Sequence, residues 1–224
     1  MWKPICLCAV LISLAATPQR ASAITVNMPN QPNSFAVLAT VNTVLGPIIR
    51  LFISYDGGAT CPNFPAVAFG SSLTETTTIN GTDHIDWIFV PTAAMTFCGY
   101  NVGPINHAGF WLNLRGKGGD DIINGGTAAF NVDGQGGHDW LACDRADCMV
   151  NGDTGNDILQ AAPSTSYIDG DSGADRGCAM NASRVIFWMY GGVGAGQTDN
   201  RCGTGSSLTQ EWEANGNCSA PCNL

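Results

Sequence analysis

The sequence has few charged residues, and few of those are basic. Charged residues make up 12% of the 224, with nine Lys and Arg against 18 Asp and Glu and a formal net charge of −9. A chain this poor in basic residues lacks the cations that neutralise nucleic-acid phosphates. The composition therefore argues against a nucleic-acid partner.

Several sequence signals are also missing. Beyond the first 23 residues, no segment approaches the roughly 20 apolar residues that a membrane-spanning helix needs. The chain has neither the HExxH pattern of zinc proteases nor the GxSxG pattern of lipases, which argues against an enzyme. It has no CxxC pair, which disfavours zinc.

The N-terminus reads as a secretory signal peptide over residues 1–23. Lys3 gives a positive start, residues 5–16 are apolar, and Ala21-Ser22-Ala23 fits a cleavage site. We expect a secreted, extracellular or cell-surface protein that begins at Ile24. Loss of Lys3 and Arg20 takes the net charge from −9 to −11.

Eight cysteines remain after the signal peptide, an even number that predicts disulfides in an oxidising compartment. Their order along the chain favours four pairs, although spacing cannot choose among about 105 possible pairings. The favoured pairs are Cys61 with Cys98, Cys143 with Cys148, Cys178 with Cys202, and Cys218 with Cys222.

The fold class predicted by composition is all-β. The chain has 28 glycines and little helical periodicity. Residues 24–109 are expected to form a small β-rich region that starts with an irregular segment over 24–33. Strands are expected at 34–43, 47–55, 74–79, 85–90 and 96–102, with another at 110–114.

A repeat dominates the middle of the chain. Four six-residue segments lie 18 residues apart, each with glycine at its first and fourth positions and aspartate at its sixth. Eighteen residues make two turn-and-strand units, so the pattern predicts a parallel β-roll over residues 110–187 and a cap or tail over 188–224. The repeated residues are Gly116, Gly119 and Asp121; Gly134, Gly137 and Asp139; Gly152, Gly155 and Asp157; and Gly170, Gly173 and Asp175.

Two columns of apolar residues repeat at the same period, as two stacked walls around one core require. The columns are Leu114, Val132, Val150, Ile168 and Ile186, and Ile123, Leu141 and Leu159.

The loop residues suit a hard divalent cation. Glycines allow positive φ and close approach of the backbone to an ion. Ca²⁺ takes 6–8 oxygen ligands from carboxylates and carbonyls. Eleven of the 18 acidic residues lie between Asp120 and Asp175, and such crowding favours a cation among them.

The block resembles the RTX, or hemolysin-type, family of calcium-binding nonapeptide repeats. The resemblance implies a parallel β-roll with Ca²⁺ between successive loops, bound by the four sixth-position aspartates and the loop carbonyls. Asp153 and Asp171 stand where many members have Gly or Asp. Only alternate nine-residue units keep the motif, so we expect about three ions, all on one side of the roll. The N-terminal signal and the cysteines depart from the family pattern.

The residues directly after three loop aspartates, Ile122, Trp140 and Ile158, are expected to point outward as an apolar stripe. Its partner is either this chain's own N-terminal region or tail, or a foreign protein or surface.

The sequence favours a secreted calcium-binding protein with calcium-dependent folding and a structural or interaction role. The alternative is a small secreted hydrolase with an active site in the N-terminal region. Its candidate residues are Glu75, Asp83, His84 and Asp86, a weak signal for paired acid and base groups. His107 is expected to be a surface residue.

Overall fold

The fold is known from a computed structural model. It describes residues 23–61, 67–70, 76–105, 111–145, 147–161, 167–179, 188–190, 200–202 and 208–210. Every regular element in these ranges is a β-strand, which confirms the all-β prediction. No helix in them is long and apolar enough to cross a membrane.

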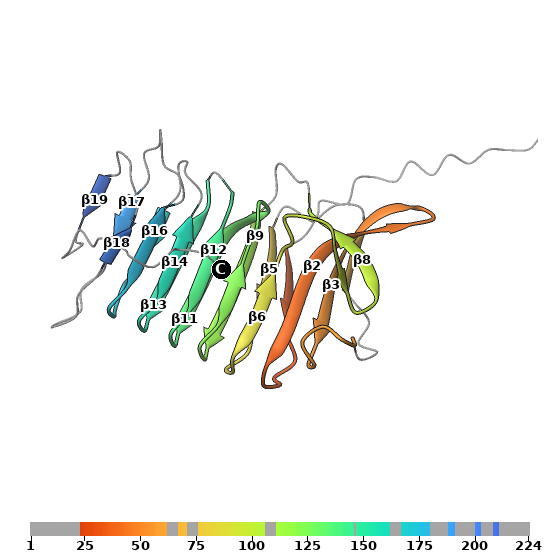
Figure 1. Ribbon diagram of the computed structural model, residues 1–224, viewed down its shortest axis with the longest axis horizontal. Coiled ribbons are helices and arrows are strands. Elements are labelled where there is room, and N and C mark those ends of the chain that lie inside the picture. Colours follow the sequence, from red (N-terminus) through yellow and green to blue (C-terminus); the bar gives the residue numbers. More distant parts are fainter. Residues whose placement is uncertain are drawn as a thin grey trace, which may run out of the picture.

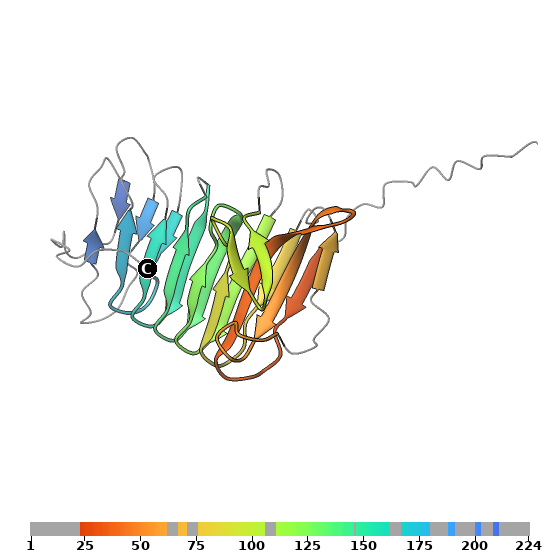
Figure 2. The same ribbon diagram turned by 45° about the vertical axis from the view of Figure 1, so that its right-hand side comes forward.

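The strands form two mainly parallel sheets, and in each sheet the strands follow one another along the long axis of the molecule (Figure 1). The chain alternates between them, so that each coil adds one strand to each sheet, and Figure 2 shows the two layers from the side. This is the predicted parallel β-roll. The eight-stranded sheet, sheet A, contains β1 (Ile24–Asn27), β5 (Thr76–Asn80), β9 (Trp111–Gly118), β11 (Ala129–Gly136), β13 (Met149–Thr154), β15 (Tyr167–Asp169), β17 (Trp188–Tyr190) and β19 (Leu208–Gln210).

The eleven-stranded sheet, sheet B, faces sheet A across the core. Its parallel part begins at β2 and continues to β18, while β3 and β4 extend it in antiparallel fashion at the N-terminal end. Its strands are β2 (Ser34–Thr43), β3 (Gly46–Ser54), β4 (Val67–Gly70), β6 (Asp86–Phe89), β7 (Met95–Phe97), β8 (Tyr100–Gly103), β10 (Ile122–Asn124), β12 (Trp140–Cys143), β14 (Ile158–Ala161), β16 (Arg176–Ala179) and β18 (Asn200–Cys202).

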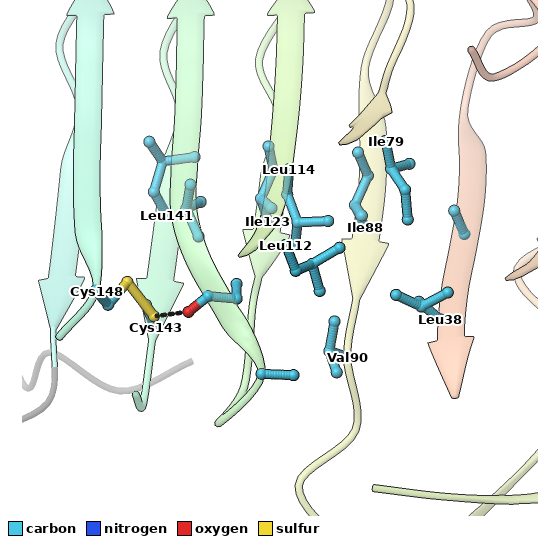
Figure 3. Close-up of a cluster of buried hydrophobic side chains, with 14 of the residues drawn as sticks. Leu38, Ile79, Ile88, Val90, Leu112, Leu114, Ile123, Leu141, Cys143 and Cys148 are labelled. Carbon is cyan, nitrogen blue, oxygen red and sulfur yellow. Dashed lines mark hydrogen bonds between the residues drawn. A yellow bond between two sulfur atoms is a disulfide. The ribbon is translucent and has the colours of Figure 1, made fainter. Parts of the chain in front are cut away.

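The core follows the apolar columns of the sequence. Leu114, Val132, Val150 and Ile168 are register partners in sheet A, and all are fully buried. The column of Ile123, Leu141 and Leu159 lies opposite them in sheet B. Figure 3 shows side chains of both columns filling the space between the sheets, with Cys143 and Cys148 at one edge.

The fifth member predicted for the first column is wrong. Ile168 pairs with Met189, not with Ile186. The step is therefore 21 residues instead of 18, and the three extra residues lie between β16 and β17, because Leu159 still pairs with Gly177 at the 18-residue step. Hydrophobic periodicity alone could not detect this shift, since both residues are apolar.

The roll starts earlier than the glycine repeat. β5 pairs with β9 and β6 with β10, so both sheets run continuously across residue 110. The segment expected to be irregular, 24–33, contains β1, which pairs with β5. The single strand expected over 96–102 is a hairpin, because Cys98 and Gly99 both have positive φ and reverse the chain between β7 and β8.

Two of the predicted disulfides are present. Cys61 bonds to Cys98, and Cys143 bonds to Cys148 inside the core. Cys178 and Cys202 are register partners on β16 and β18, but their side chains lie outside the described part of the chain. So do Cys218, Cys222 and residues 1–22, which are expected to belong to a signal peptide.

Candidate functional site

Five aspartates form a buried ladder along one edge of the roll. Four are the sixth residues of the repeated loops, which connect a strand of sheet A to the next strand of sheet B. The loop turns the aspartate side chain inward, just before the sheet B strand begins. The exposed fractions are 0% for Asp86, 1% for Asp121, 2% for Asp139, 1% for Asp157 and 1% for Asp175.

Four of the five ladder carboxylates, all but that of Asp86, accept a hydrogen bond from the backbone of the coil before them. One oxygen, Oδ1, accepts a hydrogen bond from the backbone N–H of the preceding ladder aspartate. Bonds of this kind are charge-assisted when the carboxylate is ionised. The four bonds run from Asp86 to Asp121 (2.8 Å), from Asp121 to Asp139 (2.8 Å), from Asp139 to Asp157 (2.7 Å) and from Asp157 to Asp175 (2.8 Å), with the N–H donor named first.

At least four of the ladder residues have one carboxylate oxygen that is buried without a hydrogen-bond partner. Oδ2 of Asp121, Asp139 and Asp157 is buried without a hydrogen bond, and so is Oδ1 of Asp86. A buried polar atom that lacks a partner costs about 1–3 kcal/mol, and more if it carries charge. Four of them in one row therefore require an explanation, and a bound cation or a bound proton would supply one.

The first glycine of each loop makes room for this oxygen. A Cβ on Gly116 would overlap Asp121 Oδ2 and lie 2.8 Å from the carbonyl oxygen of Gly134. The same arrangement recurs at Gly152, whose Cβ would overlap Asp157 Oδ2 and lie 3.0 Å from the Gly170 carbonyl oxygen. Carboxylate and carbonyl oxygens thus approach one point from successive coils. Both can only accept, so the pair favours a cation or a proton between them.

Positive φ occurs at the second and fourth loop positions, not at the first. The fourth position is glycine, as expected. The second position has positive φ without glycine at Lys117, Gln135, Asp153 and Asp171, with values between 59° and 84°. Such a conformation costs a residue with a Cβ about 1 kcal/mol or more, so the loop holds these four residues against their own preference.

Asp86 is a ladder residue that the repeat did not predict. Its loop, Gly81 to Asp86, keeps the first glycine and the sixth aspartate but has His84 at the fourth position. It lies 35 residues before Asp121 instead of 18, because the β7–β8 hairpin is inserted on the opposite edge. The five-residue step from Gly81 to Asp86 was the available signal.

Burial raises the pKa of the ladder carboxyl groups. Loss of solvent is the main cause in each residue, and neighbouring ladder carboxylates add to it for Asp121 and Asp157. The pKa of Asp121 and of Asp157 rises to about 8, and that of Asp139 to about 6. The pKa of Asp86 is also raised by burial, against the opposing hydrogen bonds from Thr82. Without a cation, part of the ladder therefore carries protons near neutral pH.

A second row of side chains runs beside the ladder on the outside of the loops. At the fifth loop position, each side chain accepts a hydrogen bond from the backbone N–H of the next coil. Asp120 accepts from His138, His138 Nδ1 from Asn156, and Asn156 from Ala174, each at 2.8 Å. This row uses three different acceptors, so its role is to hold the loops in register. Unlike the ladder, this row is not a series of carboxylates.

Asp153 and Asp171 lie on the outer side of the loops, at the second position. The carboxylate of Asp153 accepts a hydrogen bond from Asn151 at 3.3 Å, and it raises the pKa of Asp157 and of Asp133. Asp171 is exposed. A direct role for either residue in cation binding stays a prediction.

Within the described ranges, no three His, Cys, Asp or Glu side chains converge as a preformed metal centre. A cation on the ladder would therefore take one or two carboxylates and complete its shell with carbonyl oxygens.

Three of the four residues considered for a hydrolase, Asp83, His84 and Asp86, lie on the loop of the first ladder aspartate. Asp86 belongs to the ladder, with its carboxylate oxygens directed at Thr82 and the roll interior. Asp83 and His84 are exposed, while Glu75 and His107 lie outside the described residues.

Comparisons of the chain with protein-family models, with curated proteins and with solved structures each found no match. The geometry of the aspartate ladder is therefore the main guide to what this protein binds.

Proposed function

We propose that this chain is a secreted calcium-binding β-roll protein whose aspartate ladder takes up Ca²⁺, with a structural or interaction role outside the cell. The observation that carries the proposal is the row of buried carboxylate oxygens without partners. Those of Asp121 and Asp157 lie beside a glycine carbonyl of the next coil.

Calcium suits this set of oxygens better than the other common metals. Ca²⁺ accepts irregular shells of carboxylate and carbonyl oxygens, whereas Mg²⁺ requires near-octahedral geometry and gives up its water reluctantly. Zinc prefers nitrogen and sulfur ligands, and the ladder has neither. The resemblance of the four loops to RTX repeats supports the same ion.

The number of ions follows from the gaps between successive ladder residues. The four repeated loops leave three gaps, which gives about three ions on one side of the roll. Asp86 adds a fourth gap, between its own loop and that of Asp121. The expected ligands are the ladder carboxylates, the carbonyl oxygens of the loop glycines and, at the rim, Asp153 and Asp171.

A bound cation would neutralise the negative charge of the buried carboxylates. The protein's own residues do the rest: the first glycines admit the carboxylates, the Oδ1 bonds hold successive loops at one spacing, and the apolar columns exclude water from beneath. The two disulfides and the signal-like N-terminus fit an extracellular compartment, where calcium is abundant.

Calcium titration of the purified mature protein tests the proposal. At a calcium concentration 100 times Kd, each bound ion adds about 2.7 kcal/mol to the free energy of unfolding. For a chain of this size that corresponds to a rise in Tm of about 5–10 °C per ion. Circular dichroism melting in chelator, in Ca²⁺ and in Mg²⁺ should show the largest rise in Ca²⁺. An unchanged Tm on addition of calcium at pH 8 would show that protons alone satisfy the ladder.

A further inference from the structure

The side chain at the second position of the ladder loops changes sign along the roll. Lys117, Gln135, Asp153 and Asp171 occupy this position, so its charge passes from positive through neutral to negative. All four residues have positive φ, and the first three are register partners in sheet A. A 2.8 Å hydrogen bond from the N–H of Ser172 to the carbonyl oxygen of Asp153 continues the alignment to the last loop. The four side chains therefore hold equivalent places beside the ladder.

Two of these side chains act on a ladder carboxylate through their charge. Burial is the main cause of the raised pKa of Asp86 and of Asp157. Beyond burial and hydrogen bonds, the positive charge of Lys117 lowers the pKa of Asp86, whereas the negative charge of Asp153 raises that of Asp157. A positive charge at this position repels a cation bound to the carboxylate, and a negative charge attracts it.

Acidic residues on the N-terminal loops offset Lys117 only in part. Asp120, at the fifth position of the same loop, and Asp83, in the loop before, are both exposed and negative. His84, like Lys117, lowers the pKa of Asp86 against the larger effect of burial. The outer charges beside the first two ladder residues are thus of mixed sign.

The C-terminal loops carry outer charges of one sign. Asp153 and Asp171 are negative, and the fifth positions of their loops are asparagine and alanine. Arg176 begins β16 in sheet B, whereas Asp153 and Asp171 stand at the sheet A end of their loops. The gap between Asp157 and Asp175 is therefore bordered by two acidic second positions.

We propose that the second loop position grades calcium affinity along the ladder. The gap between Asp157 and Asp175 binds calcium tightly, and the two gaps beside the loop of Lys117 bind it more weakly, because the charge around a site tunes its affinity for the ion. This inference rests on the proposed function, since it concerns the order in which the same gaps fill. As calcium rises, the C-terminal end of the ladder is loaded first, and the N-terminal coils respond over a higher concentration range.

The size of the difference follows from Coulomb's law. One unit charge about 10 Å from a divalent ion, in surroundings close to water, changes the affinity for that ion about threefold at low ionic strength. The tight gap and the weak gaps should therefore differ about threefold to tenfold in calcium affinity, according to how far Asp120 offsets Lys117.

Amide NMR of the mature protein during calcium titration tests the grading, because the ladder bonds give each gap its own reporter. The N–H of Asp86 reports the gap to Asp121, that of Asp121 the gap to Asp139, and that of Asp157 the gap to Asp175. We expect the Asp157 amide to shift at about threefold to tenfold lower calcium than the other two. Equal midpoints for the three amides would overturn the proposal. If no ladder amide shifts, calcium does not bind, and the proposed function itself fails.

The variant Lys117→Gln isolates the effect of charge. Glutamine already has positive φ at Gln135, and the lysine ammonium it replaces has no acceptor atom, so no cation ligand is lost. The midpoints of the Asp86 and Asp121 amides should fall about threefold, while that of Asp157 stays unchanged.

The variant Asp153→Asn makes the opposite change, because it removes a negative charge. It should raise the midpoint of the Asp157 amide about threefold and leave that of Asp86 unchanged. The matched control is Gln135→Asn, a neutral change at the same loop position, which should leave all midpoints within about twofold of wild type. Midpoints that neither charge variant moves would overturn the proposal.

Salt gives a second readout that needs no variant. Because both acidic second positions act through charge, adding about 0.5 M sodium chloride to wild type should bring the three midpoints closer together. A ratio of midpoints that salt does not change would assign the difference to loop geometry and overturn the grading by charge.

Discussion

Replacing Asp157 by asparagine should stabilise the protein without calcium and destabilise it with calcium. Asparagine has the shape of aspartate, and its Oδ1 can still accept the 2.7 Å hydrogen bond from the N–H of Asp139. Its amide nitrogen takes the place of the buried Oδ2 that lacks a partner. An N–H at that point can donate toward the Gly170 carbonyl, where the carboxylate only repels it.

The size of the effect follows from the buried charge. The pKa of Asp157 is about 8, so at pH 8.5 the metal-free wild type carries an ionised carboxylate in the roll. An unsatisfied buried group of this kind costs about 1–3 kcal/mol. In chelator at pH 8.5, Asp157→Asn should therefore melt about 2–12 °C above wild type, at about 2–4 °C per kcal/mol.

Calcium should reverse this order. The variant loses a charged ligand in the two gaps that Asp157 borders. Wild type gains about 2.7 kcal/mol per ion at 100 times Kd, and the variant should gain less by at least one ion. The measurement is thermal melting by circular dichroism at pH 8.5, in chelator and in calcium.

The matched control is Asp120→Asn, the same chemical change in an exposed residue that also accepts a hydrogen bond from the next coil. It should leave both melting temperatures within about 2 °C of wild type, as surface substitutions usually do. A variant Asp157→Asn that is less stable than wild type in chelator, and that gains as much from calcium, would refute the link between the buried oxygen and the cation.

The remaining predictions concern pH and the loop glycines. In chelator, the free energy of unfolding should fall as pH rises from 5 to 8.5. The pKa is about 6 for Asp139 and about 8 for Asp121 in the folded protein, so these carboxyl groups keep protons that the unfolded chain releases near pH 4. Each such carboxyl group contributes about 1.4 kcal/mol per pH unit over its window; denaturant midpoints at four pH values measure the slope, and a rise toward pH 8 without cations would contradict it. Gly155→Ala should cost about 3 kcal/mol or more, since Gly155 has φ of +148° and a Cβ there would overlap the Gly137 carbonyl oxygen. Gly136→Ala, whose Cβ would lie 3.3 Å from Thr154 Oγ1, should cost less than about 1 kcal/mol, and equal losses in the two variants would argue against close contact between the loops.

Much of the roll could be predicted because the side chains that the fold requires repeat in the sequence with the period of the coil. The columns through Val132 and Leu141 must face the core, and the aspartates at the sixth loop position must follow the same step. Spacing therefore determined the coil length, the parallel register and the position of the ladder. The outward direction of Ile122, Trp140 and Ile158 followed from strand alternation.

Other features left no periodic signal. Asp86 was missed because an inserted hairpin changes the spacing to 35 residues, and a search for a fixed period rejects such a step. The shift to Met189 has the same origin. Of the two reasons expected for the loop glycines, positive φ does not apply to the first: at Gly116 a neighbouring carboxylate excludes a Cβ. Only the three-dimensional contacts could distinguish these causes.

The ladder bonds all point the same way along the chain, from each carboxylate back to the amide of the coil before it. The loop amide of each coil is thus hydrogen-bonded by the aspartate of the coil that follows. Duplication or deletion of a whole coil keeps every one of these bonds, whereas a single inserted residue on the loop edge would break two of them. In the described residues, the opposite edge carries no such row of carboxylate bonds, and it accommodates the β7–β8 hairpin. In evolution, such a protein can grow by whole coils and diversify along one edge while the other edge keeps its spacing.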